Sequence, residues 1–399
     1  MEREGLIKKV GNGLFALLIF LFLADPTNSI FHLKNIVFIL LFSFNVVFYK
    51  ADYAEARYFL YGVFVVSFSF VVANLRGTII DLVELKAIYT SFVPLLLLPW
   101  IKRYDILKLS RIPVLVTACI VVGLFWLIFF FPMIEGAVYA FVWSHDNTIM
   151  MSHRYFLGMS FFGMYCKSTV AMLPVFCIAV YNVVTPSKRN LIDFLLVLVL
   201  LHLFLISGTR SSTLLPLLLF VAILFVYCRN HRYLKYFFYP ALFVATVGIL
   251  VVLYMLAMEK DEASNIVKYA HITSYLNLFE WNPIFLVFGQ GPVTYFYSEG
   301  FRHMTNITEW TYLELLRCYG LLSLVILYII TKPLFLMIKN VNRSDATIAF
   351  ILGYLLYLVI AGTNPLLLSS TGMLVVLSGY GFLARIEGGD TSVNVKEGK

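Results

Sequence analysis

Long apolar segments recur along the whole of this 399-residue chain, and they restrict its fold more than any other feature. A helix needs about 20 predominantly apolar residues to cross a bilayer. Such segments lie near residues 13–31, 35–49, 58–74, 81–100, 112–134, 158–184, 190–206, 212–228, 237–258, 311–331, 346–362 and 366–384. Because 61% of the residues are hydrophobic and only 13% are charged, a water-soluble fold could not bury them all. The sequence therefore predicts an all-α integral membrane protein with about twelve transmembrane helices.

The distribution of basic residues predicts the orientation of these helices. The chain carries 30 Lys and Arg against 22 Asp and Glu, and a net charge of +8 could also suggest nucleic-acid binding. The basic residues concentrate, however, in short segments between the apolar runs. If the helices alternate across a membrane, 20 of the 30 fall on the side of the N-terminus. We therefore expect both termini in the cytoplasm and no nucleic-acid partner.

Two of the expected external connections are long, and the second of them divides the chain. Residues 1–258 would hold helices one to nine, 311–385 helices ten to twelve, and 386–399 a polar, disordered cytoplasmic tail. The long connections are about 135–157 and 259–310. Connections of this length are usually functional or disordered. Aromatic residues and apolar periodicity over Ile266–Phe279 predict that the second connection is ordered.

The sequence Ser-Gly-Thr-Arg-Ser-Ser at 207–212 lies between the seventh and eighth apolar runs. It places Arg210 close to membrane depth, where an arginine is costly unless it meets an anion or a water-filled cavity. The planar guanidinium can bind phosphate through two parallel hydrogen bonds. Arg210 is therefore a candidate phosphate ligand, and the alternative is a turn whose arginine extends to lipid phosphates.

The first half of the long external loop combines a basic helical face with a glycine turn. Lys268 and His271 are three residues apart and would share one face of a helix. The turn Gly289-Gln290-Gly291-Pro292 allows close approach of the backbone. It lacks the preceding strand and the third glycine of a nucleotide-binding fingerprint. An interfacial helix followed by a turn is the alternative interpretation.

The second half of the loop places titratable groups around the start of the tenth apolar run. Arg302, His303 and Glu309 precede this run, whereas Glu314 and Arg317 lie in its first turns and can pair with each other. Glu309 has no partner nearby in the sequence. A carboxylate at a membrane-facing cavity can act as a general base. The alternative is a helix-start residue favoured by the helix dipole.

Other candidates lie elsewhere on the expected external side. Arg76 at the end of the third helix and Arg154 in the smaller loop could bind a phosphate or sugar, or simply be solvated. The chain has no HExxH, DxD or Walker A motif, and its five cysteines form no CxxC pair. We therefore expect no metal ion and no cofactor, so that arginine and lysine would have to neutralise any bound phosphate.

The order and spacing of these features resemble the bacterial superfamily of O-antigen polymerases (Wzy-type) and O-antigen ligases (WaaL-type). The resemblance covers about residues 190–325 and rests on Thr209-Arg210-Ser211, Lys268 before Asn282-Pro283, the glycine turn at 289–292, and Glu309-Trp310 followed by Gly320. Family members carry arginine where this chain has Lys268 and histidine where it has Glu309. The missing histidine favours a polymerase over a ligase, because polymerases diverge at that position.

The resemblance implies an inverting, metal-independent membrane glycosyltransferase of the GT-C type. It would join oligosaccharide repeat units carried on undecaprenyl diphosphate at the periplasmic face of the bacterial inner membrane, with a flippase and a chain-length regulator as partners. Arg210, Lys268 and Arg302 would hold the diphosphate. Glu309 would be the general base, with His303 or His271 as substitutes. The alternatives are a ligase that transfers glycan to lipid A-core and a transporter or flippase of lipid-linked sugars.

Overall fold

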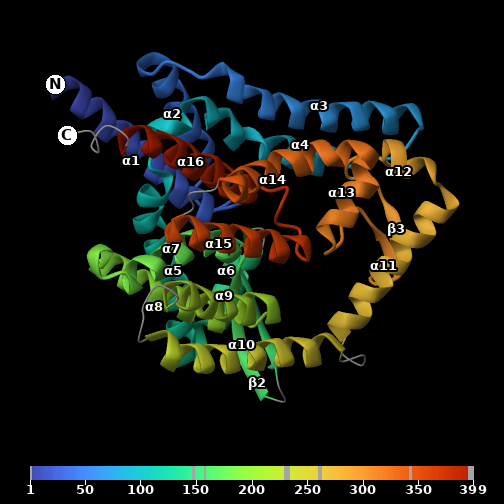
Figure 1. Cartoon of the computed structure of the whole chain (residues 1–399). Helices are drawn as coiled ribbons and strands as arrows, with labels where there is room; N and C mark the ends of the chain where they lie inside the picture. The colour runs from blue at the N-terminus through green and yellow to red at the C-terminus, as the bar shows by residue number, and fades with distance from the viewer. Residues whose placement is uncertain are drawn as a thin grey trace.

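The computed structural model describes residues 2–145, 149–156, 159–228, 234–258, 263–340 and 344–393. This part of the chain is mostly helical (Figure 1). The first half contains α1 (Glu2–Ala24), α2 (Lys34–Phe48), α3 (Tyr53–Leu75), α4 (Leu82–Ser91), the 3₁₀ helix η1 (Val93–Arg103), α5 (Ile106–Phe130), η2 (Pro132–Ile134), α6 (Glu135–Ser144), β1 (Ile149–Phe156), β2 (Met159–Cys166), η3 (Thr169–Met172), α7 (Leu173–Val184) and η4 (Pro186–Lys188). The second half contains α8 (Leu191–Ile206), α9 (Arg210–Cys228), α10 (Leu234–Met258), α11 (Ala263–Trp281), α12 (Ile284–Phe288), β3 (Phe296–Ser298), β4 (His303–Thr305), α13 (Thr311–Tyr319), η5 (Gly320–Leu322), α14 (Ser323–Lys339), α15 (Asp345–Gly362) and α16 (Ser370–Val393).

The length and apolar character of the helices define a multi-pass, α-helical membrane protein. Among the described residues, 7 helical segments are long and apolar enough to cross a membrane: Arg3–Ala24, Tyr53–Leu75, Leu82–Arg103, Ile106–Phe130, Ser211–Cys228, Thr311–Lys339 and Asp345–Gly362. Shorter apolar helices of 10–17 residues cover Lys34–Phe48, Thr169–Val184, Leu191–Ile206 and Tyr239–Val251. The count of twelve spans stays a prediction.

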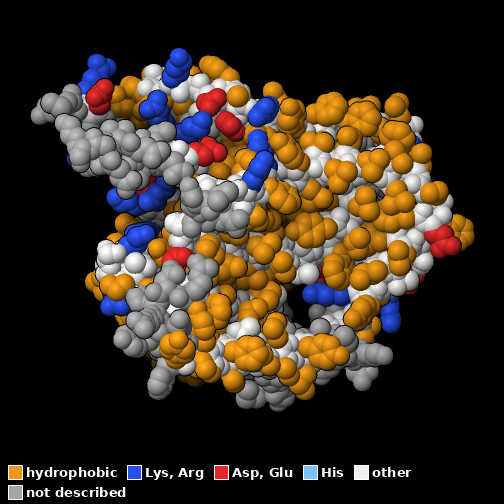
Figure 2. Space-filling view, in the orientation of Figure 1, with side chains coloured by type: hydrophobic (Ala, Val, Ile, Leu, Met, Phe, Trp, Pro, Cys, Tyr) orange, Lys and Arg blue, Asp and Glu red, His pale blue; other side chains and the backbone are white. Residues whose placement is uncertain are grey.

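The first and last helices lie side by side and run in opposite directions. The hydroxyl of Thr371, at the start of α16, donates a hydrogen bond to the carbonyl of Phe22, near the end of α1 (3.0 Å). The beginning of α1 therefore lies at the same end of the molecule as the later turns of α16. Figure 1 shows α11 and α12 at the opposite end. Figure 2 shows many Lys and Arg side chains at the end where α1 begins.

The apolar run at 158–184 is not a single helix, so this part of the sequence prediction is wrong. β1 pairs antiparallel with β2, and the helix α7 begins only after η3. Aromatic residues in β2 favour an extended strand, and short apolar runs fit both strands and helices. A Cβ atom at Gly163 would lie 3.3 Å from the Cα of Gly208, so β2 packs closely against the turn that precedes α9.

The boundaries of the first and last helices also differ from the prediction. α1 ends at Ala24 rather than near residue 31, because the ring of Pro26 disfavours a helical backbone at the preceding residue, Asp25. The buried carboxylate of Asp25 then accepts the N–H groups of Ser29 (2.9 Å) and Phe31 (2.7 Å), which holds the following turn. At the other end, α16 continues to Val393 and so enters the expected tail, of which residues 394–399 lie outside the described part.

Candidate functional site

The external loop expected over 259–310 is an ordered unit from residue 263 onward. Its first element, α11, confirms that residues 266–279 are ordered, and it makes this segment a helix. α12 and the hairpin of β3 and β4 follow, with Phe296 opposite Thr305 and Ser298 opposite His303. The hairpin returns the chain to α13, and Figure 1 shows these elements gathered at one end of the molecule.

The glycine turn and Gly320 are in direct contact, although they lie far apart in the sequence. The backbone N–H of Gln290 donates to the carbonyl of Arg317 (2.6 Å). Gly289 and Gly320 have φ of 73° and 56°, backbone conformations that residues with a side chain rarely adopt. A Cβ atom at Gly320 would also lie 2.4 Å from the carbonyl oxygen of Val287. The glycine turn and Gly320, two parts of the sequence pattern, therefore pack directly against each other in the fold.

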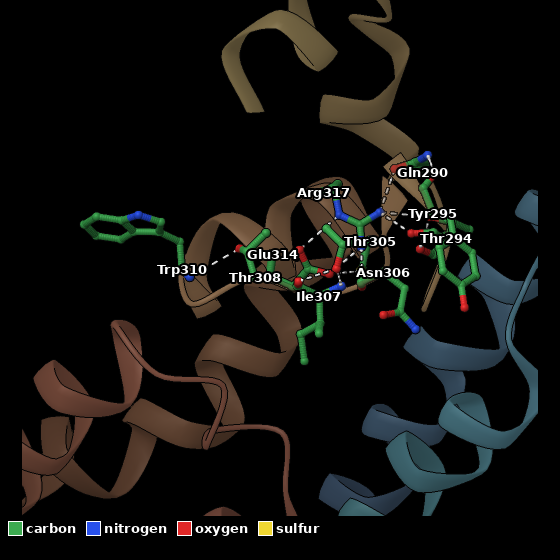
Figure 3. A network of polar contacts seen from close by, with 12 residues as sticks. Gln290, Thr294, Tyr295, Thr305, Asn306, Ile307, Thr308, Trp310, Glu314 and Arg317 are labelled. Atoms are coloured by element: carbon green, nitrogen blue, oxygen red, sulfur yellow. Dashed lines mark hydrogen bonds and ion pairs between the residues drawn. The ribbon is translucent and has the colours of Figure 1, made fainter. Parts of the chain in front are cut away.

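The fully buried Arg317 is the centre of a polar network in this loop (Figure 3). Its Nε donates to Glu314 (3.0 Å), and Nη2 forms a second, short bond to the same carboxylate. Nη1 donates to Gln290 (2.6 Å) and to the carbonyl of Thr294 (2.8 Å), while Nη2 also donates to the carbonyl of Asn306 (2.9 Å). The predicted pairing of Glu314 with Arg317 is thus confirmed.

Tyr275 of α11 completes this network and ties α11 to α13. Its hydroxyl donates to Glu314 (2.6 Å) and lies 2.5 Å from the hydroxyl of Thr308. Burial, together with the nearby Glu314 carboxylate, raises the pKa of Tyr275, so the phenol stays protonated and donates. Held by Arg317 and Tyr275, the Glu314 carboxylate has a structural role. Sequence reasoning missed Tyr275 because it lies 39 residues from Glu314, beyond any local spacing.

A cavity of about 220 Å³ lies beside the network. Its lining includes Glu84, Asn306, Thr308, Glu314 and Pro365. Pockets for small ligands usually have volumes of about 300–1,000 Å³. The cavity alone is therefore too small for an oligosaccharide repeat unit. Sequence reasoning did not single out Glu84, which comes from α4 and has no local relation to the loop.

Lys268 and Glu309 come together, which their sequence positions did not predict. The Nζ of Lys268 lies 3.6 Å from Oε2 of Glu309, and the two side chains remain 32% and 42% exposed. The indole N–H of Trp310 donates to the backbone carbonyl of Lys268 (3.0 Å), which joins α11 to the start of α13. Figure 2 shows a hollow between α10 and α11 with basic side chains at its edge. A cation and a carboxylate therefore meet at an accessible place on the loop.

The two predicted histidines of the loop differ in accessibility. His271 is fully buried, and its Nδ1 lies 2.8 Å from the hydroxyl oxygen of Ser298. Burial lowers the pKa of His271, an effect that nearby Glu309 opposes. Among the described residues its Nε2 has no hydrogen-bond partner. His303 is exposed and stacks on Phe301, with 5.6 Å between the ring centroids. In this arrangement only His303 is accessible to a substrate hydroxyl.

Arg76 fastens the glycine turn to the third helix. Its Nη1 donates to the carbonyl of Gly289 (2.7 Å), and its guanidinium lies 5.4 Å from the ring centre of Phe285. An antiparallel β-bridge between Ile80 and Thr294 joins the same two parts of the chain. The structure therefore gives Arg76 a packing role at the base of the loop.

The other predicted arginines lie on separate elements. Arg302 is exposed in the turn between β3 and β4, with φ of 56°. Arg210 begins α9, and Arg154 lies in β1 opposite Phe161. The side chains of Arg210 and Arg154 lie outside the described part of the structure. Lys268, His271 and Glu309 thus form the group that the structure brings together, with Arg302 and His303 on the adjoining hairpin.

No group of three or more His, Cys, Asp or Glu side chains is placed to hold a metal ion within the described ranges. Comparison of the chain with protein-family models, with curated proteins and with solved structures finds no match. The function must therefore be inferred from the chemistry of the loop and from the sequence pattern.

Proposed function

We propose that this chain is a membrane glycosyltransferase that polymerises oligosaccharide repeat units carried on undecaprenyl diphosphate. The observation that carries the proposal is the accessible pair of Lys268 and Glu309, 3.6 Å apart. Glycosyl transfer from a lipid diphosphate needs a cation that stabilises the leaving phosphate and a base that takes a proton from the acceptor hydroxyl. The pair supplies one group of each kind on an ordered scaffold.

The proposed reaction is a single displacement at the anomeric carbon of the donor glycan. A bound diphosphate attracts the Lys268 ammonium and leaves the Glu309 carboxylate free to accept the proton of the acceptor hydroxyl. The acceptor oxygen forms the glycosidic bond as the bond from the anomeric carbon to the diphosphate oxygen breaks. The lipid diphosphate departs with that electron pair, stabilised by Lys268, Arg210 and Arg302. A single displacement inverts the configuration of the anomeric carbon.

We place the loop at the periplasmic face of the bacterial inner membrane and both termini in the cytoplasm. The antiparallel packing of α1 and α16 supports this placement, as does the side on which 20 of the 30 basic residues are expected. A flippase that supplies lipid-linked units and a regulator of chain length are the proposed partners.

Purified protein in liposomes, supplied only with lipid-linked repeat units, tests the proposal. We expect products of two or more repeats on one lipid, resolved as a ladder on a gel. Products that form only when lipid A-core is added, each with a single repeat attached, would instead identify a ligase. If neither substrate set is consumed by protein that is folded and correctly inserted, the glycosyltransferase assignment is wrong.

Arg210 gives a sharper test of diphosphate binding. If its planar guanidinium binds two phosphate oxygens, lysine cannot replace it, because a single ammonium lacks the paired donor geometry. Both Arg210→Ala and Arg210→Lys should therefore lose polymer formation while reaching normal protein levels in the membrane. The measurement is the same product ladder, normalised to protein amount. A wild-type product ladder from Arg210→Ala would show that Arg210 is a residue of the turn with no part in binding diphosphate.

A further inference from the structure

A second, larger cavity opens at the end of the molecule opposite the loop. It has a volume of about 1000 Å³ and lies between α1, α5 and α16, beside the segment that joins η1 to α5. Figure 1 shows α1 and α16 together at this end, away from α11. The cationic side chains of its lining are Lys8, Lys102, Arg103, Lys108 and Arg385.

The positive charge of this cavity is only partly balanced. Lys102 pairs with Asp52 (3.1 Å), and Arg385 pairs with Asp105 (3.2 Å). Within the described part of the chain, three further cations have no carboxylate within 4.0 Å: Lys8, Arg103 and Lys108. The exposed cations at the mouth are therefore able to bind an anion.

The walls of the cavity change from charged to apolar along the helix axes. On α1 the lining residues are spaced by four, in the order Lys8, Asn12, Ala16 and Phe20. On α5 the same spacing gives Lys108, Ile112 and Val116. At a rise of about 1.5 Å per residue, the distance from the first to the last of the α1 residues is about 18 Å. Half of a bilayer's hydrocarbon core is about 15 Å thick, so the lining from the Lys8 cation to Phe20 covers about the depth of one leaflet, with its apolar part at the inner end.

We propose that this cavity binds an acidic phospholipid, with the phosphate headgroup at the three unbalanced cations and an acyl chain along the apolar walls. Basic pockets between transmembrane helices on the cytoplasmic side suit anionic headgroups. Free phosphate would use the cations but would leave the apolar walls without a ligand. A zwitterionic lipid would bring a positive group of its own into a basic pocket. This proposal is independent of the glycosyltransferase assignment, because it uses none of the loop residues.

Binding of radiolabelled phosphatidylglycerol to the full-length protein in neutral detergent tests the proposal. The test variant is Lys8→Gln/Arg103→Gln/Lys108→Gln. The control variant, Lys9→Gln/Lys50→Gln/Lys339→Gln, removes the same charge from exposed lysines outside the cavity lining. Each cation near an anionic lipid contributes roughly a fivefold gain in affinity, so the test variant, which lacks three, should bind on the order of 100-fold more weakly. The control variant should bind as the wild type does.

Competition experiments identify the source of the bound phosphate. Unlabelled phosphatidylglycerol should displace the label from the wild type, whereas phosphatidylcholine and inorganic phosphate at the same concentration should not. Equal displacement by inorganic phosphate would show an anion site and overturn the lipid proposal. Equal weakening in the two triple variants would also overturn it, because general surface charge would then explain the binding. Melting curves without lipid check that both variants fold.

Discussion

A Glu309→Gln protein should fold and insert normally but join repeat units about 10²–10⁴-fold more slowly than the wild type, the usual loss when a general base is removed. Glutamine keeps the size and hydrogen-bonding capacity of the side chain but cannot take up a proton from a hydroxyl. The Glu309 side chain is 42% exposed, so its replacement leaves no buried group without a partner. The measurement is the initial rate of chain extension by purified protein in liposomes, with binding of the lipid-linked donor measured in parallel.

Glu299→Gln is the matched control for this experiment. Glu299 is an exposed carboxylate of the same loop and has no cation within 4.0 Å among the residues that the structure describes. Its variant should keep wild-type rates. Wild-type extension by Glu309→Gln would exclude Glu309 as the base and direct attention to His303, the exposed histidine of the hairpin. Loss of donor binding together with rate would indicate that Glu309 positions Lys268 rather than accepting a proton.

An Arg317→Leu protein should lose about 3–5 kcal/mol of its free energy of unfolding, the usual effect of removing one partner from a buried ion pair. The substitution leaves the Glu314 carboxylate without its cation and removes the donors that bind Gln290, Thr294 and Asn306. We expect little folded protein in membranes and a much lower melting temperature in detergent. The contacts among α11, the glycine turn and α13 should be lost together.

Two further variants separate this effect from a general loss of charge. Arg385→Leu removes an ion pair whose arginine is 62% exposed, and exposed pairs contribute only about 0–1 kcal/mol. Its melting temperature should therefore stay close to that of the wild type. Arg317→Leu/Glu314→Leu should be more stable than Arg317→Leu alone, since no unpaired buried carboxylate remains. A wild-type melting curve for Arg317→Leu would refute the structural role of the network.

The sequence predicted those parts of the fold that depend on local pattern. Apolar runs mark the long helices directly, and the periodicity over residues 266–279 correctly predicted an ordered segment, which forms α11. The single helix predicted over 158–184 is wrong, because an aromatic, apolar segment that contains Gly163 suits a strand packed against another backbone as well as it suits a helix. The pairing with β1 and the contact with Gly208 distinguish the two, and local sequence encodes neither of them.

The candidate site shows the same division between local and distant contacts. The pairing of Glu314 with Arg317 followed from their spacing on one helix. The contact of Lys268 with Glu309 depends on how α11 docks beside α13, and local spacing does not encode that geometry. Sequence reasoning left Arg76 as either a phosphate or sugar ligand or a solvated residue, and it did not predict the hydrogen bond to Gly289 that the structure shows.

The hydrogen bond between Arg76 of the third helix and Gly289 of the loop can form only late in synthesis of the chain. Arg76 and its partner Gly289 are separated by 213 residues, so at about 5–20 residues per second the ribosome needs roughly 10–40 s to reach the second after the first. The early helices therefore have time to enter the membrane before the loop emerges. The loop then docks onto a surface that already exists. A chain truncated before Gly289 would lack the partner of Arg76 and also helices α13 to α16, so α3, α7 and η1 would expose the surfaces that these later helices cover.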